Sequence, residues 1–261
     1  MRGLLNLGNT CYFNTAVQCL AHAPPLSRFL IEAEPYTGPC DVTREYQKVV
    51  RQLFLKDVTD PVDPSALLGA FRTRFPSFAN PNEQHDAQEV ILVLIDLFEK
   101  SFSEKFIRSI FNGQECQETV YPKGVSKKES EFVTCILFPT SETSLEDLIK
   151  RREKHVGIEG YVDDDGTRYN IAAVRQVVTR WPRILGFTFS MYENKFPIKI
   201  PLEFGDHKLF ALVIHQGIQW GGHYALIVRR HDKWFIKDDD TVREIPEVPL
   251  QGPFYMAWYR S

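Results

Sequence analysis

The pattern of apolar residues changes once along the chain, near Phe111, and this change limits the possible folds more than any other feature. Before it, apolar residues recur at helical spacing, as at Phe13, Val17 and Leu20 and along the segment DAQEVILVLIDLFEKSF. After it, short runs of β-branched and aromatic residues alternate with Gly, Pro and Asp clusters, which is typical of strands and hairpins. One helical segment, SLEDLIKRREKH, interrupts the strands. This order predicts an α+β fold with its cleft between the two parts.

The chain length of 261 residues predicts one domain with two parts, a helical one over about 1–111 and a strand-rich one over about 112–261. The net charge of -3 argues against general nucleic-acid binding. No apolar stretch approaches the roughly 20 residues of a membrane-spanning helix, and the N-terminus lacks the features of a secretion signal. We therefore expect a cytoplasmic or nuclear protein that binds neither nucleic acid nor membrane.

The five cysteines are sparse and include no C-x-x-C pair: Cys11, Cys19, Cys40, Cys116 and Cys135. An odd set of this kind disfavours both a disulfide framework and a structural zinc site. We expect reduced thiols and no metal or other cofactor.

Cys11 follows the turn-forming segment NLGNT and precedes an apolar run, which predicts that it lies in the first turn of a helix. Gly8 allows a sharp turn, and Asn9 or Thr10 is a suitable N-cap. Unpaired N–H groups and the positive end of the helix dipole lower the pKa of a thiol at this position, which suits a nucleophile. The alternative is that Cys11 is a small apolar residue of a buried helix, as we expect for the other four cysteines.

A nucleophilic thiol needs a base, and the base needs a partner that orients it. His223 opens an apolar strand in QWGGHYALIVRRHDKWFIKDDD, and a second strand leads to an Asp triplet. A hairpin centred on the dipeptide HD places Asp238 and Asp240 on the face of His223 and Asp239 on the opposite face. A register slip of one residue would reverse this arrangement.

Each of these residues also has a simpler interpretation. His223 could be a strand-end histidine without a task, and the Asp triplet a solvated turn. His215, at the end of the preceding strand, is a competing base, but no carboxylate follows it at hairpin distance. The combination of a helix-initiating Cys11 with His223 and Asp238 favours a Cys-His-Asp site.

Several segments together resemble one family, the ubiquitin-specific proteases, which are papain-like cysteine peptidases that remove ubiquitin. GLLNLGNTCYFN is similar to the cysteine box of that family, and HQGIQWGGHYALIVR with KWFIKDDDTV is similar to its histidine box. NEQHDAQEVILVLID resembles the Gln-Gln-Asp-Ala-Gln-Glu-Phe segment, with His85 and Val90 as variations. RWPRILGFTFSMYENKFPIKIPLEF and GPFYMAWYRS match the palm strands, so the resemblance spans the chain. It implies a helical thumb, a β-rich palm and short β-fingers.

The resemblance also implies roles for five residues at the site of chemistry. Cys11 would be the nucleophile, His223 the base, and Asp238 the residue that orients the imidazole. The side-chain amide of Asn6 would hold the oxyanion, with Asp239 as an auxiliary polar residue close to it. The alternative for Asn6 is a turn residue that satisfies the local backbone.

The resemblance implies six substrate-binding residues: Gln84, Asp86, Glu89, Gly221, Gly222 and Tyr224. Asp86 and Glu89 would contact arginines in the basic C-terminal tail of ubiquitin, and a narrow cleft would admit its terminal Gly-Gly. The alternative for this acidic pair is an N-terminal capping box of the helix that follows.

The chain departs from the family pattern in the fingers. Many members carry two C-x-x-C zinc knuckles there, but Cys116 has no second cysteine nearby, and the segment GYVDDDGTRYN has none. The run from Asp163 to Gly166 predicts a hairpin turn, because it lacks the spacing of a calcium loop. We expect short fingers without metal.

Three functions remain open at this point. The leading one is thiol-dependent hydrolysis of isopeptide or peptide bonds after the C-terminal Gly-Gly of ubiquitin, by a monomer whose partners are ubiquitin and its conjugates. The second is a protease for another ubiquitin-like modifier that shares this ending. The third is a non-catalytic ubiquitin-binding module, against which the presence of Cys11, His223 and Asp238 argues.

Overall fold

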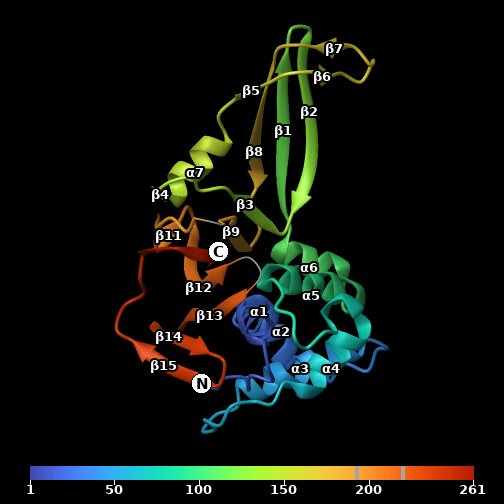
Figure 1. The fold of residues 1–261 in the computed structure, drawn as a ribbon. Helices are drawn as coiled ribbons and strands as arrows, with labels where there is room; N and C mark the ends of the chain where they lie inside the picture. The colour runs from blue at the N-terminus through green and yellow to red at the C-terminus, as the bar shows by residue number, and fades with distance from the viewer. Residues whose placement is uncertain (192–193, 219–220) are drawn as a thin grey trace.

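A computed structural model describes residues 1–191, 194–218 and 221–261 and shows the predicted α+β architecture (Figure 1). Helices make up the N-terminal part, and α6 ends at Phe111, where the sequence pattern changes. Their bounds are α1 (Cys11–Ala21), α2 (Pro24–Glu32), α3 (Asp41–Leu53), α4 (Ser65–Arg74), a 3-10 turn (Pro76–Phe78), α5 (Ala87–Ser101) and α6 (Glu104–Phe111). In the described part of the chain no helix is long and apolar enough to cross a membrane.

The largest sheet, called here the main sheet, has the strand order β15-β14-β13-β12-β17-β9-β3, with β11 added to β12. All these pairs are antiparallel except β3 with β9. Its strands are β3 (Thr134–Leu137), β9 (Ile184–Phe189), β11 (Glu203–Phe204), β12 (His207–Ile218), β13 (Gly221–Arg230), β14 (Lys233–Asp238), β15 (Thr241–Ile245) and β17 (Phe254–Arg260). A small sheet joins β4 (Thr143–Ser144), β10 (Ile198–Lys199) and β16 (Gln251–Gly252), and α7 (Leu145–Arg152) is the predicted helical insertion.

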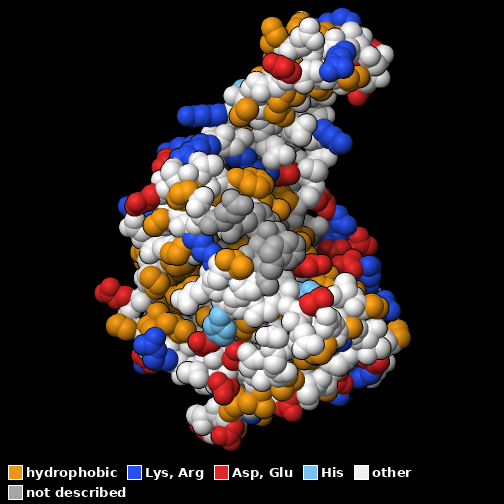
Figure 2. All heavy atoms as spheres, viewed as in Figure 1, with side chains coloured by type: hydrophobic (Ala, Val, Ile, Leu, Met, Phe, Trp, Pro, Cys, Tyr) orange, Lys and Arg blue, Asp and Glu red, His pale blue; other side chains and the backbone are white. Residues whose placement is uncertain are grey.

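A second sheet, the finger sheet, projects from the body as a narrow extension (Figures 1 and 2). Its order is β2-β1-β8-β5, formed by β1 (Gly113–Tyr121), β2 (Gly124–Phe132), β5 (Val156–Ile158) and β8 (Ala172–Arg180). Cys116 lies within β1 and pairs across the ladder with Glu129 and Val177. The cysteine therefore has the setting of a strand residue.

Aromatic packing occupies the tip of the finger sheet, where β6 (Tyr161–Val162) and β7 (Arg168–Tyr169) form a hairpin. The ring of Tyr121 lies 5.1 Å from that of Tyr161 and 5.0 Å from that of Tyr169. The Asp163 carboxylate accepts hydrogen bonds from the N–H groups of Asp165 and Thr167, which closes the predicted hairpin turn. Ring contacts and this turn hold the tip together.

Helix α1 lies at the centre of the molecule, in contact with α5 on one side and with β13 of the main sheet on the other. Every residue of α1 is buried, which matches a helix enclosed on all sides. The apolar run after Cys11 is therefore explained by burial, while the first turn of α1 is left beside the strand that carries His223. Helix α1 ends at Ala21, and α2 begins at Pro24.

The face of the molecule in Figure 2 carries basic, acidic and hydrophobic side chains intermixed. This distribution suits the small net charge of the sequence and shows no single-sign stripe on that face.

Candidate active site

Cys11 begins α1 at the end of a tight turn and is buried there. Gly8 and Asn9 have positive φ angles of 92° and 51°, and Thr10 is the N-cap without a side-chain cap bond. The Asn6 side-chain oxygen instead accepts the N–H of Gly8 at 2.9 Å and that of Thr10 at 3.4 Å. The thiol is only 2% exposed, and it donates a weak hydrogen bond to the carbonyl of Gly222 at 3.9 Å.

Burial of the thiol raises the pKa of Cys11 above its ordinary value, and the nearby Asp239 carboxylate adds to this effect. Backbone N–H groups of Tyr224 and Tyr12 lower the pKa but do not outweigh burial. The expectation of a lowered pKa is thus wrong for this structure, because removal from water costs the thiolate more than the helix start returns. The thiol in this arrangement is protonated and needs a base.

The hairpin of β13 and β14 has the register that the sequence predicts. Arg230 pairs with Lys233, and His231 and Asp232 form the two-residue turn with φ angles of 47° and 62°. Two positive φ angles are those of a type I′ turn, whose twist matches that of antiparallel strands. The predicted pairing holds as far as Leu226 with Lys237, whereas Asp239 and Asp240 form the turn into β15 and lie outside the ladder.

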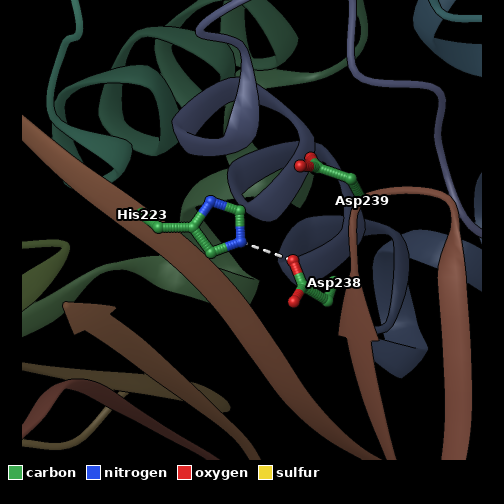
Figure 3. A group of neighbouring side chains, drawn as sticks. All are labelled: His223, Asp238 and Asp239. Carbon is green, nitrogen blue, oxygen red and sulfur yellow. Dashed lines mark hydrogen bonds and ion pairs between the residues drawn. The ribbon is translucent and has the colours of Figure 1, made fainter.

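His223 and Asp238 face each other across the end of this hairpin (Figure 3). Nε2 of His223 lies 2.5 Å from Oδ1 of Asp238, and both side chains are about half exposed, at 45% and 48%. Figure 3 shows the other ring nitrogen, Nδ1, directed away from the carboxylate. A carboxylate on one ring nitrogen fixes the ring and leaves the other nitrogen available to accept a proton.

Asp239 points to another side from Asp238 and bonds to the N-terminal segment. Its Oδ2 accepts a hydrogen bond from Nδ2 of Asn6 at 2.6 Å. Asn6 is exposed, and its amide nitrogen carries a second hydrogen. Asn6 therefore also makes the turn contacts of its alternative interpretation, and its geometry accommodates both roles.

Gln84 and Gly222, two of the six predicted binding residues, contact each other. The side-chain oxygen of Gln84 accepts the N–H of Gly222 at 2.5 Å, which joins the segment before α5 to β13. A Cβ atom on Gly222 would lie 2.4 Å from the carbonyl oxygen of Gln216 and 2.5 Å from the ring of His215. Close packing of β13 on β12 thus requires glycine here, in addition to any approach of a substrate chain.

A pocket of about 260 Å³ lies next to this contact. Five of the predicted binding residues line it, namely Gln84, Asp86, Glu89, Gly221 and Tyr224, together with His85, Met191, Lys195, His215, Ile218 and Tyr255. Acidic side chains and Lys195 share its wall. The pocket can therefore hold an extended, polar chain segment with a basic group directed at the carboxylates.

His215, the competing base, belongs to this pocket and differs in setting from His223. It pairs with Tyr224 across β12 and β13, so it lies on the opposite face of the sheet from His223. Its ring stacks on that of Tyr224 at 4.3 Å, and Lys195 lies 3.4 Å from its Nδ1. Burial, aided by Lys195, lowers the pKa of His215 to about 4, which makes it a weak proton acceptor.

Asp86 is the N-cap of α5, as the alternative interpretation expects. Its Oδ1 accepts the N–H of Gln88 at 2.6 Å, and Tyr255 donates its hydroxyl to the same carboxylate at 2.5 Å. Glu89 is exposed in the first turn. Among the six residues, Asp86 is thus already bonded within the protein, while Glu89 is open to a ligand.

Sequence reasoning did not identify three residues at the site: Asn14, Lys195 and Tyr255. Asn14 is a polar residue in a helix that is otherwise mainly apolar, one turn after Cys11, and that position is a usable signal. Lys195 and Tyr255 line the pocket only because the fold brings their segments next to residues that are distant in sequence.

One group of side chains in the described residues has the donor set of a metal site. A ring nitrogen of His223 and carboxylate oxygens of Asp238 and Asp239 lie within 4.8 Å of one another. Each already has a partner of opposite hydrogen-bonding character, which explains the cluster without an ion.

Comparison with known proteins identifies the family of the chain. The family model for ubiquitin carboxyl-terminal hydrolase matches residues 2–259. The chain belongs to this family. The resemblance of the cysteine and histidine boxes is thereby confirmed.

Several ubiquitin carboxyl-terminal hydrolases are similar to this chain. Ubiquitin carboxyl-terminal hydrolase 16 of Arabidopsis thaliana is 21% identical over 98% of the chain. Ubiquitin carboxyl-terminal hydrolase 22 of Bos taurus is 24% identical over 100% of the chain. The 17-like protein D of Mus musculus is 24% identical over 92%. The chain spans 30%, 67% and 51% of these proteins respectively.

The fold is that of a ubiquitin-specific protease catalytic domain, as expected. The solved SAGA Ubp8/Sgf11/Sus1/Sgf73 DUB module bound to ubiquitin aldehyde contains a chain that matches with a TM-score of 0.83 and 18% identity. The match covers 100% of this chain and 69% of that one.

The raised pKa of Cys11 predicts slow alkylation at neutral pH, because only the thiolate reacts. Cys40 is an internal control: burial raises the pKa of its thiol, but hydrogen bonds from Thr43 and Ser101 outweigh this and leave the pKa lowered. With iodoacetamide and peptide mass mapping from pH 6 to 10, the rate at Cys11 should still rise at pH values where the rate at Cys40 has reached its plateau. If the alkylation rate of Cys11 reached its plateau at a lower pH than that of Cys40, this electrostatic account would be contradicted.

Proposed function

We propose that the protein is a cysteine-type deubiquitinase, which hydrolyses isopeptide or peptide bonds after the C-terminal Gly-Gly of ubiquitin. The observation that carries this proposal is the His223–Asp238 pair at the start of β13, where the neighbouring residue Gly222 contacts the thiol of Cys11. A thiol, a free ring nitrogen and an oriented imidazole are the parts that nucleophilic acyl transfer requires.

The first half of the reaction forms a thioester. The sulfur of Cys11 attacks the carbonyl carbon of the scissile bond, and its proton passes to Nδ1 of His223. Asp238 stabilises the resulting imidazolium, while the free hydrogen of the Asn6 amide donates to the oxyanion. When the intermediate collapses, the C–N bond breaks and His223 gives its proton to the departing amine.

The second half restores the enzyme. Water attacks the thioester carbonyl and gives a proton to His223, and a second tetrahedral intermediate forms at the same oxyanion position. Its collapse breaks the C–S bond, the thiol regains the proton, and ubiquitin leaves with a terminal carboxylate. The raised pKa of Cys11 makes His223 essential, because the thiol supplies little thiolate by itself.

Substrate entry requires a local opening of the cleft. Cys11 is buried, and the bond between Gln84 and Gly222 closes the way between the segment before α5 and β13. A tail that ends in Gly-Gly can replace this bond with its own backbone groups and adds no side-chain bulk. Its arginines would then contact the acidic wall of the neighbouring pocket, where Glu89 is exposed.

The second candidate is a protease for another ubiquitin-like modifier with the same Gly-Gly ending. The finger sheet favours its inclusion, because its tip is built from tyrosine rings and its single cysteine, Cys116, lies within β1 and belongs to no zinc knuckle. A different tip presents a different surface to the globular part of the modifier.

Hydrolysis of a ubiquitin–aminocoumarin substrate tests the proposed roles. Cys11→Ala and His223→Ala should each abolish turnover, whereas Asp238→Ala should lower kcat about ten- to a thousandfold, since packing still holds part of the imidazole geometry. His215→Ala, on the other face of the sheet and in the wall of the pocket, tests the competing base. Turnover that survives Cys11→Ala, or greater damage from His215→Ala than from His223→Ala, would contradict the assignment.

Two substitutions at Asp86 separate substrate binding from capping. Asp86→Asn keeps an acceptor for the N–H of Gln88, so the melting temperature should barely change, while kcat/KM should fall about ten- to a hundredfold through KM if the charge contacts a substrate arginine. Asp86→Ala removes the acceptor as well and should cost about 1 kcal/mol of unfolding free energy. If Asp86→Asn leaves kcat/KM unchanged, Asp86 acts as a cap and Glu89 becomes the residue to test.

A further inference from the structure

Asn14 is a buried amide whose hydrogen bonds go to the groups that surround Asn6. It lies on α1, one turn after Cys11, and is only 2% exposed. Its Nδ2 donates to Oδ1 of Asp239 at 2.8 Å and to the carbonyl of Leu5 at 3.2 Å. Because these partners are acceptors, the nitrogen and not the oxygen must face them.

The same carboxylate links Asn14 to Asn6. Oδ1 of Asp239 accepts from Asn14, and Oδ2 accepts from Asn6 at 2.6 Å. An ionised carboxylate only accepts hydrogen bonds, so Asp239 fixes which end of the Asn6 amide faces it. The Asn6 oxygen is correspondingly turned to the N–H of Gly8.

The second hydrogen bond of Asn14 acts on the backbone. Leu5 immediately precedes Asn6, so its carbonyl marks the direction in which the chain enters that residue. The two amide hydrogens of Asn14 therefore hold both the backbone before Asn6 and the carboxylate that orients its side chain. The Asn14 oxygen is buried and has no hydrogen-bond partner in the part of the chain that the structure describes, a cost that an apolar residue in α1 would avoid.

We propose that Asn14 is a positioning residue, which holds the side-chain amide of Asn6 at the oxyanion position through Asp239 and Leu5. The inference rests on the proposed function, because it needs Asn6 to donate to an oxyanion. A displacement of about 1 Å at such a donor is enough to reduce a rate about a hundredfold, so a buried residue that touches no substrate can control kcat. The hydrogen bonds of Asn14 go to neither the thiol of Cys11 nor the ring of His223.

Gln18 provides a matched control one turn further along α1. It is as buried as Asn14, at 2%, and ties the same N-terminal segment by donating to the carbonyl of Arg2 at 3.2 Å. Its oxygen accepts from Lys237 at 2.8 Å, so it does not bond to Asp239. A general loosening of this segment should follow from Gln18→Ala as well as from Asn14→Ala.

The test is a double-mutant cycle on hydrolysis of ubiquitin–aminocoumarin by the full chain. Asn6→Ala should lower kcat about a hundred- to a thousandfold, and Asn14→Ala about ten- to a hundredfold with KM within about twofold. In the Asn6→Ala background, Asn14→Ala should cost less than about threefold, because there is no amide left to position. Gln18→Ala should lower kcat by less than about threefold, although it lowers the melting temperature.

Three results would overturn the inference. One is an equal loss from Asn14→Ala in both backgrounds, and another is an equal loss of kcat from Gln18→Ala. The third is an unchanged kcat in Asn6→Ala, which would remove the oxyanion role while Cys11→Ala still reports separately on the proposed hydrolase. If Asn14→Ala does not fold, Asp239→Ala removes the carboxylate that links Asn14 to Asn6, at a partly buried position. The same non-additivity with Asn6→Ala is then expected.

Discussion

The N-terminal segment before α1 is held between two distant parts of the chain, and the geometry of the site depends on this contact. Leu5 donates its N–H to the carbonyl of Val62, and Leu4 donates its N–H to the carbonyl of Asp239, at 3.0 and 2.9 Å. A Cβ atom on Gly3 would lie 2.4 Å from that same Asp239 carbonyl, so only glycine allows the approach. The helical part and the main sheet are thereby joined by the segment that precedes Cys11.

This contact of the N-terminal segment explains how Cys11 and His223, which are far apart in sequence, lie at one site. Helix α1 is fixed by burial on all sides, and the β13–β14 hairpin is fixed by its register and its type I′ turn. The segment over residues 3–10 connects these two rigid elements. The chemistry therefore depends on packing at the centre of the molecule, and the finger sheet lies apart from it (Figure 1).

Burial also has a chemical cost, which the structure shows at Cys11. The helix start that positions the thiol removes it from water, and the pKa rises as a result. A protonated, covered thiol reacts slowly with small electrophiles, whereas in the proposed reaction a bound substrate tail brings the carbonyl to a base that is already oriented by Asp238. Low reactivity without substrate and activity with it are compatible in this arrangement.

Local rules were sufficient for much of the fold and part of the site. Periodicity located α1, α5 and the insertion α7, and alternation along two strands correctly paired Asp238 with His223. The pKa of Cys11 was wrongly expected to be lowered, because burial depends on α5 and β13, which are distant in sequence. The contact of Gln84 with Gly222 and the bonds of Asn14 to Asp239 likewise join distant segments, which no local pattern specifies.

The capping bond of Asp86 shows an intermediate case. The sequence permitted both a cap and a substrate contact, and the structure supplies the cap together with an unexpected partner, Tyr255. A tyrosine in the last strand could not be assigned to the start of α5 without the topology of the main sheet, which places β17 next to β12.

The central claim is that Cys11 attacks the C-terminal carbonyl of ubiquitin within the cleft built by α1 and β13. The most direct measurement is peptide mass mapping after reaction with ubiquitin that carries a C-terminal electrophile, in parallel with other ubiquitin-like modifiers prepared in the same way. The account predicts one stoichiometric adduct, on Cys11, with the ubiquitin probe. No adduct with any modifier, or an adduct on Cys40 in place of Cys11, would contradict it.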